Sequence, residues 1–318
     1  MESLIRKLKK EKTGLLIQTH DYPDYDAIAS AYGLKIFLSH YGLKSDVCYA
    51  GKIPLFVRDG FLKSLELDLY PVNAVLDQTR PVLVVDTNPY TGNLTPLKNP
   101  YWGFIDHHIN NYDPARDYFY RDVRKIGATS SIIASMFNEF GVPLAALPAT
   151  ALAVGLFTDT FNLIRGVSEE DLQAYAFLFP RMDAELMKLS VINKLTIDDL
   201  EFYKRAIDSL VVLDNMAVVT VAGISDRNLL GIMADFFLSL MEITANLMIN
   251  ITEEGTHLSC RSLDSSFNAA RLVRSLTEGR GSGGGHSYMA GGFIPGQVDI
   301  KEIHAILEST LETMKKGG

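Results

Sequence analysis

The segment His20-Asp21-Tyr22-Pro23-Asp24-Tyr25-Asp26 decides the fold prediction, because it joins an apolar run to the start of a helix. Residues 14–19 are typical of a short buried strand, because an apolar run begins just after Gly14. Residues 27–40 predict the helix. One imidazole and several carboxylates therefore lie where a strand's carboxyl end meets a helix, the usual place of a ligand site in an open α/β sheet. Crowded carboxylates repel one another unless a cation compensates, so the segment indicates either a metal site or a solvated acidic turn.

Two further apolar runs end in the same kinds of side chain. Residues 81–85 predict a buried strand that ends at Asp86, and residues 102–108 hold another that ends in the sequence Asp-His-His. Strands that alternate with helices predict an α/β fold, here a doubly wound, mostly parallel sheet. In such a sheet the carboxyl ends of the strands lie side by side, so we expect these groups to converge with His20.

An acidic residue also stands at the end of an apolar helix. Residues 147–161 predict a strongly apolar helix with Asp159 near its carboxyl end, where a negative charge opposes the helix dipole. Something else must stabilise this carboxylate, and a cation is a natural candidate. Just upstream, residues 127–131 predict the start of another helix, which runs to about Glu139.

The composition is that of a folded protein with 318 residues, 47% of them hydrophobic and 21% charged. This length accommodates two domains, and the net charge of −8 argues against tight, salt-driven binding to long nucleic acid. Cys48 and Cys260 lie in strand-like segments and are interpreted as buried thiols of a reducing compartment rather than a disulfide or a ligand pair. The first ten residues predict an amphipathic helix rather than a signal peptide. No apolar run reaches the length of a membrane span, so we expect a cytoplasmic location.

A second pattern of strands and helices begins near residue 200. Its elements are predicted as a hairpin, a helix, two strands and a helix, over residues 211–221, 227–241, 245–251, 257–261 and 268–276. The Gly-rich segment 281–286 follows and is expected to form a loop. We therefore predict a catalytic domain over residues 1–190, a linker over 191–200 and a smaller α/β domain over 201–318.

The candidate functional residues of the first domain share hard oxygen or imidazole donors at the ends of apolar elements. They are His20, Asp24, Asp26, Asp86, Asp106, His107, His108 and Asp159. A donor set without thiolates suits Mn²⁺ or Mg²⁺, with Co²⁺ or Fe²⁺ as alternatives, better than a structural Zn²⁺. There are enough carboxylates for two ions with one bridging ligand. Two such ions generate a hydroxide and stabilise an in-line phosphoryl transition state, so the pattern indicates hydrolysis of a phosphate ester or anhydride.

Taken in order, these residues resemble the four motifs of the DHH phosphoesterase superfamily. The motifs are carried by His20-x-x-x-Asp24-x-Asp26, by Asp86 after its strand, by Asp106-His107-His108 and by Asp159. The Gly-rich segment 283–292 resembles the hallmark of the DHHA1 substrate domain found in this family. The resemblance implies an active site in the cleft between the two domains.

The resemblance also implies a role for each candidate. Two Mn²⁺ ions share one ligand, with His20 and Asp24 on the first ion, Asp26, His107 and Asp159 on the second, and Asp86 bridging both. His108 contacts the scissile phosphate as a donor or general acid, and Asp106 orients the histidine pair. The residues alone do not separate His107 from His108, so that assignment depends on the resemblance.

The Gly-rich segment has a physical interpretation of its own. Consecutive glycines let backbone N–H groups approach an anion, although such a run also forms plain flexible turns. Arg261 offers a guanidinium that matches a phosphate in two-point contact. The predicted substrate-binding residues are Arg261, Ser262, Gly284, Gly285 and His286. Arg271 and Arg274 are secondary candidates, for which a solvated helix face is an equal alternative.

Some residues depart from the family pattern. Tyr25 and Ala29 stand where glycine is common, and residues 161–165 replace the usual Gly-x-Phe-Arg run. All the metal ligands are kept, so these departures bear on the substrate rather than on catalysis.

We therefore expect a Mn-dependent phosphoesterase with two divalent cations, Mg²⁺ and Co²⁺ being alternatives to Mn²⁺. Resemblance to the oligoribonuclease branch implies short oligoribonucleotides and 3′-phosphoadenosine 5′-phosphate as substrates. The alternatives are a phosphodiesterase for cyclic or linear dinucleotides, a pyrophosphatase or exopolyphosphatase, and a non-catalytic nucleotide sensor. The expected partners are small nucleotides or short single-stranded RNA, without long DNA or membrane, and a homodimer is left open.

Overall fold

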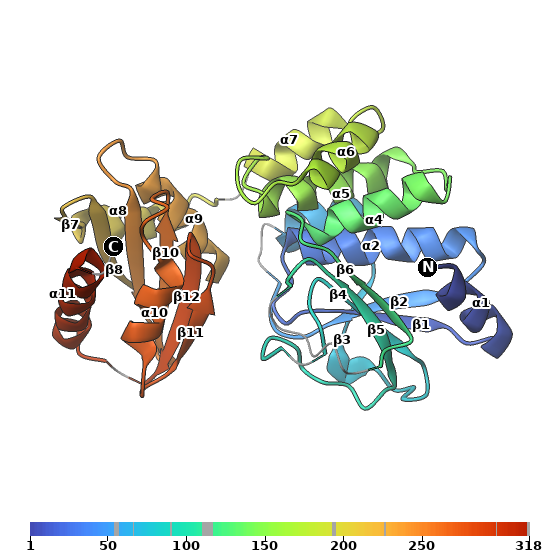
Figure 1. Ribbon diagram of the computed structural model, residues 1–318, viewed down its shortest axis with the longest axis horizontal. Helices are drawn as coiled ribbons and strands as arrows, with labels where there is room; N and C mark the ends of the chain where they lie inside the picture. Colours follow the sequence, from blue (N-terminus) through green and yellow to red (C-terminus); the bar gives the residue numbers. More distant parts are fainter. Residues whose placement is uncertain are drawn as a thin grey trace. The chain divides into compact units, whose positions relative to one another are not determined.

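The computed structural model describes residues 1–53, 57–65, 67–89, 91–109, 117–192, 195–225, 227–296 and 298–316. The chain forms two compact units, Met1–Lys194 and Leu195–Gly318 (Figure 1). Each unit has its own sheet, with hydrophobic side chains packed on both faces of it. Part of the predicted linker, residues 193–194, lies outside the described residues.

The first unit is built on a six-stranded sheet in the order β3-β2-β1-β4-β5-β6, in which every neighbouring pair is parallel. Its strands are β1 (Leu15–Thr19), β2 (Ser45–Tyr49), β3 (Leu69–Pro71), β4 (Val82–Val85), β5 (Tyr101–Asp106) and β6 (Tyr120–Val123). The central strands β1 and β4 are buried along their whole length, as expected for parallel strands that are covered on both faces. The α/β class and the parallel sheet predicted from the sequence are confirmed.

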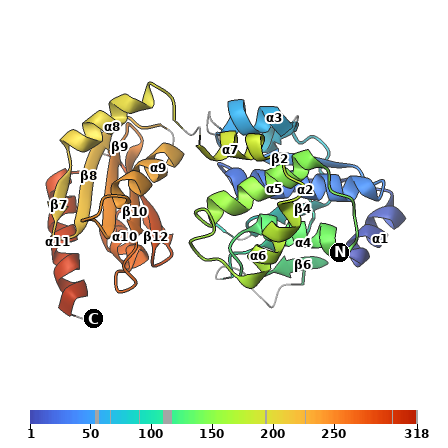
Figure 2. The ribbon, with the colours of Figure 1, turned by 90° about the horizontal axis from the view of Figure 1, so that it is seen from above.

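The helices of the first unit pack on one face of this sheet. The main helices α2, α4, α5, α6 and α7 lie above the sheet in Figure 1 and in front of it in Figure 2. The helices are α1 (Glu2–Glu11), α2 (Tyr25–His40), α3 (Lys63–Leu65), α4 (Thr129–Glu139), α5 (Ala146–Asp159), α6 (Glu169–Leu178) and α7 (Ala184–Ile192), with a π-helical turn η1 (Val57–Leu62). Their apolar side chains form one core with those of β1 and β4.

The sheet has the strand order of the predicted doubly wound fold, and its other face is covered mainly by irregular segments. Among the described residues, this face packs Leu16 and Val84 against Leu94 and other side chains of irregular segments. Within the described part of these connections, the helical element is a short 3₁₀ turn, η2 (Val72–Ala74). The connection from β3 to β4 is too short for an ordinary crossover helix, and prolines interrupt the connection from β4 to β5.

Close packing of three helices brings the predicted metal ligand Asp26 near the start of α4. A Cβ atom at Gly155 of α5 would lie 2.3 Å from Ser130 Oγ on α4 and 3.0 Å from Asp26 Oδ1 on α2. Glycine therefore lets these three helices approach each other at their polar ends. The amino terminus of α4 thereby reaches the carboxylate of Asp26.

The second unit holds a mixed six-stranded sheet in the order β11-β12-β10-β9-β8-β7, in which β8 and β9 are parallel and the other pairs antiparallel. Its strands are β7 (Val211–Leu213), β8 (Met216–Ala222), β9 (Ala245–Ile251), β10 (Gly255–Ser262), β11 (Ser282–Gly285) and β12 (Met289–Pro295). Its helices are α8 (Asp199–Asp208), α9 (Arg227–Leu238), α10 (Ala269–Thr277) and α11 (Ile300–Lys316). Helices α8 and α9 share one core with the sheet, and α10 and α11 share the other. In the parts of the chain that the structure describes, none of the helices combines the length and apolar character needed to cross a membrane.

The Gly-rich segment forms an edge strand, so the prediction of a loop is wrong. Strand β11 pairs antiparallel with β12, through backbone groups that need no side chains and leave no hydrophobic pattern to recognise. A Cβ atom at Gly283 would lie 2.7 Å from Val273 Cγ1 and 2.8 Å from Thr277 Oγ1, so glycine there is required by packing against α10. At Gly284 a Cβ atom would meet nothing within 4 Å.

Candidate metal centre

The predicted metal ligands lie at the carboxyl edge of the parallel sheet. They come from the turn after β1 (His20, Asp24), the start of α2 (Asp26), the ends of β4 (Asp86) and β5 (His107), and the last residue of α5 (Asp159). Asp24 also caps α2, because its Oδ1 accepts the Ala27 N–H at 3.1 Å. The structure thus brings together groups that are far apart in the sequence.

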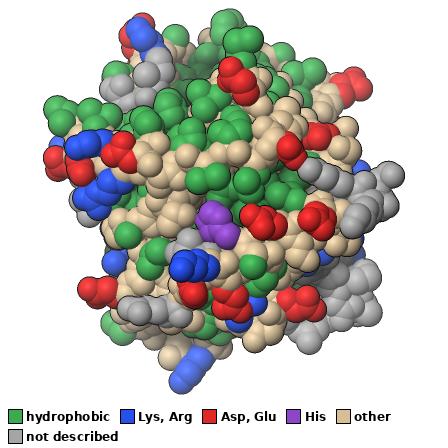
Figure 3. All heavy atoms as spheres, turned by 90° about the vertical axis from the view of Figure 1, so that its left-hand side faces the viewer, with side chains coloured by type: hydrophobic (Ala, Val, Ile, Leu, Met, Phe, Trp, Pro, Cys, Tyr) green, Lys and Arg blue, Asp and Glu red, His purple; other side chains and the backbone are tan. Residues whose placement is uncertain are grey.

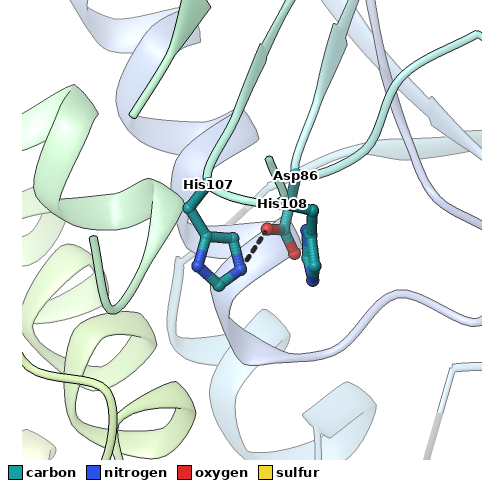
Figure 4. A group of neighbouring side chains, drawn as sticks. All are labelled: Asp86, His107 and His108. Atoms are coloured by element: carbon teal, nitrogen blue, oxygen red, sulfur yellow. Dashed lines mark ion pairs between the residues drawn. The ribbon is translucent and has the colours of Figure 1, made fainter. Parts of the chain in front are cut away.

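Asp86 lies at the centre of this group. Its Oδ2 is 3.4 Å from His20 Nε2, and its Oδ1 is 3.5 Å from His107 Nε2. Figure 4 shows the second of these contacts, with His108 on the other side of the carboxylate. The two oxygens of one carboxylate therefore face two different imidazoles, as required of a ligand that bridges two ions.

The predicted ligands form two groups of three side chains, one that contains Asp86 and one that lies next to it. The ligand atoms of each group lie within 4.8 Å of one another: His20, Asp24 and Asp86 in one, and Asp26, His107 and Asp159 in the other. His107 Nε2 is 3.3 Å from Asp159 Oδ2, and His20 Nε2 is 3.8 Å from Asp24 Oδ1. A third group of this kind joins His108 to Asp86 and His107. The structure thus assembles all six predicted ligands, and it leaves both histidines within reach of Asp86.

The histidines are oriented by hydrogen bonds on their other nitrogen. His20 Nδ1 lies 2.9 Å from the Asp21 carbonyl, and His107 Nδ1 lies 3.1 Å from the Ile126 carbonyl. A carbonyl only accepts, so Nδ1 carries a proton in both rings, and Nε2 is the atom that faces the carboxylates. Loss of the Nε2 proton would leave the tautomer that a metal ligand needs.

His108 is held by a different partner. The buried carboxylate of Asp106 accepts hydrogen bonds from His108 Nδ1 at 2.8 Å and from its backbone N–H at 3.1 Å. The His108 side chain is 41% exposed, so its remaining nitrogen can meet a ligand. This geometry suits the predicted pairing of a positioning carboxylate with a phosphate donor.

The charges of the centre favour a bound cation. Burial raises the pKa of Asp159 to about 6, and burial with the neighbouring carboxylates raises the pKa of Asp26 well above its ordinary value. Burial lowers the pKa of His107, but Asp159 and Asp86 outweigh it and raise this pKa to about 9. The facing imidazoles hold the pKa of Asp86 below its usual range in spite of burial. Protons on carboxylates and imidazoles thus supply the positive charge that a divalent ion supplies on binding.

One predicted ligand has an uncommon backbone conformation. Asp86 has a φ of 61°, in the left-handed region that non-glycine residues rarely occupy. Its backbone N–H still bonds the Ile105 carbonyl at 2.9 Å. Such conformations are typical of functional sites, where the surrounding structure holds them.

The segment 126–131 orients several of the predicted ligands, a role that the sequence analysis missed. The backbone N–H groups of Thr129 and Ser130 donate to the two oxygens of Asp26 at 2.7 and 2.8 Å, and the Thr129 hydroxyl donates to Asp86 at 2.8 Å. From α6, the buried Asp171 accepts the Gly127 N–H at 2.7 Å. The available signal was a run of small and hydroxyl residues at a helix start whose own N-cap residue is an alanine.

The predicted substrate-binding residues lie in the second unit, and several have structural partners. Arg261 Nε is 3.4 Å from Asp235 Oδ1 on α9. The Ser262 hydroxyl accepts the Asp264 N–H at 3.0 Å and donates to the Thr244 carbonyl at 3.3 Å, so it stabilises the turn after β10.

The remaining candidates lie along β11. Gly285 has a φ of 138°, and the ring of His286 stacks on Tyr288 with centroids 5.3 Å apart. The secondary candidates Arg271 and Arg274 line an open cavity of about 470 Å³ beside β11. The substrate roles of all these residues stay predictions.

Sequence comparisons show which known families and proteins this chain is similar to. Residues 15–156 match the model of the DHH family, N-terminal domain, and residues 214–313 match the DHHA1 domain. The uncharacterized protein MJ1633 of Methanocaldococcus jannaschii is 32% identical over 290 residues, which are 90% of this chain and 59% of that protein. A probable manganese-dependent inorganic pyrophosphatase of Streptococcus pyogenes is 30% identical over 156 residues, 47% of this chain and 49% of the relative. The chain thus spans between about half and three-fifths of the length of these curated relatives.

A solved structure shows the same fold across both units. It is that of an exopolyphosphatase-related protein from Bacteroides fragilis, with a TM-score of 0.81 and 19% identity, covering 99% of this chain and 97% of that one. The likeness extends from the parallel sheet that carries the ligands to the mixed sheet that carries β11. With both domain models matched in order, the chain belongs to the DHH family and carries a DHHA1 domain after its DHH domain.

Proposed function

We propose that this chain is a metal-dependent phosphoesterase that hydrolyses phosphodiester or phosphomonoester bonds of small nucleotides. The observation that carries the proposal is the position of Asp86, whose two oxygens face His20 and His107 at 3.4 and 3.5 Å. One carboxylate shared by two groups of oxygen and nitrogen donors fits two divalent cations, with Mn²⁺ as the first choice and Mg²⁺ or Co²⁺ as alternatives. Such cations, when bound, supply Lewis acidity that activates water and neutralises charge on a phosphoryl group.

The chain's own groups have separate tasks in this proposal. His20, Asp24 and Asp86 would hold one cation, and Asp26, His107 and Asp159 would hold the other. Asp86 would be shared between them, since its Oδ1 lies 3.5 Å from His107 Nε2. His108 presents its outer nitrogen to the phosphate, where it donates a proton or a hydrogen bond. Burial lowers the pKa of His108, but its hydrogen bond to Asp106 helps to raise it above the ordinary value, which keeps the donating form present near neutral pH. Asp106 fixes the ring by holding Nδ1.

Features of the second unit support a nucleotide substrate. On β11, Gly284 is opposite Gly291 of β12, and a Cβ atom at Gly284 would contact nothing. Successive residues of a strand face opposite sides, so Gly284 faces away from α10, which lies against Gly283. The fold does not explain this glycine, whereas close approach of a substrate to the backbone would.

Small substrates fit the surface charge better than long nucleic acid. On the face of the molecule seen in Figure 3, Lys and Arg side chains are interspersed with Asp and Glu rather than gathered in a stripe. The formal net charge is −8, and long nucleic acid requires many phosphate contacts from basic residues. We therefore propose short oligoribonucleotides and nucleoside bisphosphates as the substrate class.

Inorganic pyrophosphate is the second candidate substrate. It is favoured by the Streptococcus pyogenes relative, described as a probable manganese-dependent inorganic pyrophosphatase, which matches 47% of this chain. The same metal centre can serve either substrate, so the second unit is the part that separates them.

A substrate panel with Mn²⁺ tests the proposal. It spans dinucleotides to pentanucleotides, 3′-phosphoadenosine 5′-phosphate, cyclic dinucleotides and pyrophosphate, and we expect the highest kcat/KM on the shortest nucleotides. Preference for pyrophosphate would establish the second candidate, and tight nucleotide binding without turnover would establish a sensor. Asp86→Ala should abolish hydrolysis of bis-p-nitrophenyl phosphate and weaken Mn²⁺ binding, while Asp68→Ala, at an exposed position of the same unit, leaves both unchanged. Parent activity in Asp86→Ala would refute the shared-ligand assignment.

A further inference from the structure

Asp171 is a buried carboxylate of α6 that belongs to none of the metal-binding groups found among the described residues. A buried charge is costly unless hydrogen bonds compensate it. Two donors come from outside α6, the Gly127 N–H at 2.7 Å and the Ser131 hydroxyl at 2.6 Å. Two more come from Ser168, whose N–H and hydroxyl donate at 2.8 and 2.7 Å. Four donors thus satisfy this carboxylate without a cation.

The helix that carries Asp171 explains only half of these bonds. Ser168 is the N-cap of α6, and with Asp171 it forms a capping box that satisfies the first free N–H groups of the helix. The bonds to Gly127 and Ser131 instead reach residues that lie 44 and 40 positions earlier in the chain. These two bonds hold the segment 126–131 near both of its ends, which capping of α6 does not require.

The segment that Asp171 holds contacts three predicted metal ligands. Its backbone or hydroxyl groups bond His107 at 3.1 Å, Asp86 at 2.8 Å and Asp26 at 2.7 and 2.8 Å. A Cβ atom at Gly127 would lie 2.5 Å from Thr160 Cγ2 and 3.0 Å from Asp171 Oδ2. The segment is therefore confined between Asp171 and Thr160, which directly follows the predicted ligand Asp159.

We propose that Asp171 is a positioning residue of the metal centre, because it holds the segment 126–131 where its backbone and hydroxyl groups orient the predicted ligands. Removal of groups that orient metal ligands commonly weakens metal binding or activity roughly tenfold to a hundredfold. Asp171 acts one step further from the ion, through its bonds to Gly127 and Ser131. The inference rests on the proposed function, since it requires the two-cation centre, and it adds α6 to the elements that determine metal affinity.

Two serines that donate to the same carboxylate form a matched pair for the test. The Ser131 hydroxyl joins Asp171 to the segment 126–131, whereas the Ser168 hydroxyl joins it only to the cap of α6. Ser131→Ala, Ser168→Ala, Asp171→Ala and the double variant Asp171→Ala/Ser131→Ala are made in the full chain. Calorimetric titration well below the Tm measures Mn²⁺ affinity, and thermal unfolding measures the Tm with and without Mn²⁺. A purely structural role would lower the Tm equally in both conditions and leave the Mn²⁺ affinity unchanged.

We expect Asp171→Ala to weaken Mn²⁺ binding roughly tenfold or more and to reduce the rise in Tm that Mn²⁺ produces. Ser131→Ala should weaken Mn²⁺ binding roughly threefold to tenfold. The double variant should bind Mn²⁺ no more weakly than Asp171→Ala, because both substitutions remove the same contact. Ser168→Ala should lower the Tm through loss of the cap and keep the parent affinity for Mn²⁺.

Parent affinity for Mn²⁺ in both Asp171→Ala and Ser131→Ala would overturn the positioning role and leave the proposed function intact. Equal weakening in Ser131→Ala and Ser168→Ala would also overturn it, because disruption of α6 would then account for the effect. If Asp171→Ala does not fold, the two serine variants decide the question by the same criteria. Absence of Mn²⁺ binding in the parent would instead refute the two-cation centre, and the proposed function would fail together with this inference.

Discussion

Adjacent glycines of β11 should respond in opposite ways to the same substitution. Gly283 faces α10, where an added Cβ would lie 2.7 Å from Val273 Cγ1 and 2.8 Å from Thr277 Oγ1. Gly284 faces away from α10, where an added Cβ meets nothing within 4 Å, and its φ is not positive. Gly283→Ala and Gly284→Ala thus form a matched pair that separates packing from substrate contact.

The magnitudes follow from these contacts. Overpacking of this kind costs roughly 1–3 kcal/mol, so Gly283→Ala should lower the Tm of the second unit by roughly 4–12 °C. Alanine fits the backbone at Gly284, so Gly284→Ala should stabilise the chain by about 0.4–1 kcal/mol through the unfolded state. If the substrate approaches this backbone closely, the same methyl group should reduce kcat/KM for nucleotides roughly tenfold or more.

Calorimetry of the full chain and kinetics on two substrates measure both effects. Bis-p-nitrophenyl phosphate serves as the reference substrate, because it lacks the distal part of a nucleotide, and Gly284→Ala should leave its hydrolysis unchanged. Equal destabilisation by both substitutions would refute the assigned facing of β11. A stable Gly284→Ala protein with parent kinetics on nucleotides would refute the substrate contact.

Three further predictions concern the metal centre. Gly155→Ala should weaken Mn²⁺ binding and lower the free energy of unfolding by roughly 1–3 kcal/mol, because the added Cβ would displace Ser130 and Asp26. Isothermal titration measures the Mn²⁺ affinity and thermal unfolding measures the stability. An unchanged Mn²⁺ affinity would contradict this packing. Mn²⁺ affinity should rise up to about tenfold per pH unit between pH 6 and 9, because the ion displaces the proton held by His107 (pKa about 9). Below pH 6 the affinity should fall more steeply with decreasing pH, because Asp159 (pKa about 6) also protonates. Calorimetric titration in buffers of different ionisation enthalpy would show the released proton, and an affinity independent of pH would count against these ligands. Asp106→Asn should lower kcat roughly tenfold to a hundredfold without changing Mn²⁺ affinity, because the carboxylate positions His108. If the variant lost Mn²⁺ binding, His108 would be a metal ligand and not a phosphate donor.

The convergence of the candidate ligands was predictable from the sequence because most of their positions follow from strand ends. Asp86 and His107 each come directly after a buried strand, and the parallel sheet brings such ends to one edge. Asp159 was recognisable from the conflict between its charge and the helix dipole. These signals are local, so a single sequence contains them.

The groups that orient the ligands were not predictable in the same way. Thr129 and Ser130 act through backbone N–H groups, which every residue except proline possesses. Likewise β11 is held by backbone pairing and by contacts with α10 across glycine, so its sequence resembles a flexible loop. The irregular cover on one face of the parallel sheet depends on connection lengths, which hydrophobic periodicity does not report.

The hydrogen bonds of Asp26 have a consequence for how the first unit responds to its metal. Helix α4 begins at Thr129 after an alanine that offers no side-chain cap, and the carboxylate of Asp26 accepts the first two free N–H groups of the helix instead. A residue predicted to bind metal is thus also the cap of another helix. Since coupling between two equilibria is reciprocal, opening of the first turn of α4 and departure of the cation should favour each other. Amide hydrogen exchange at Thr129 and Ser130 should therefore be faster without the metal than with it. Exchange at these two amides would report metal occupancy, although α4 contributes no ligand of its own to the predicted centre.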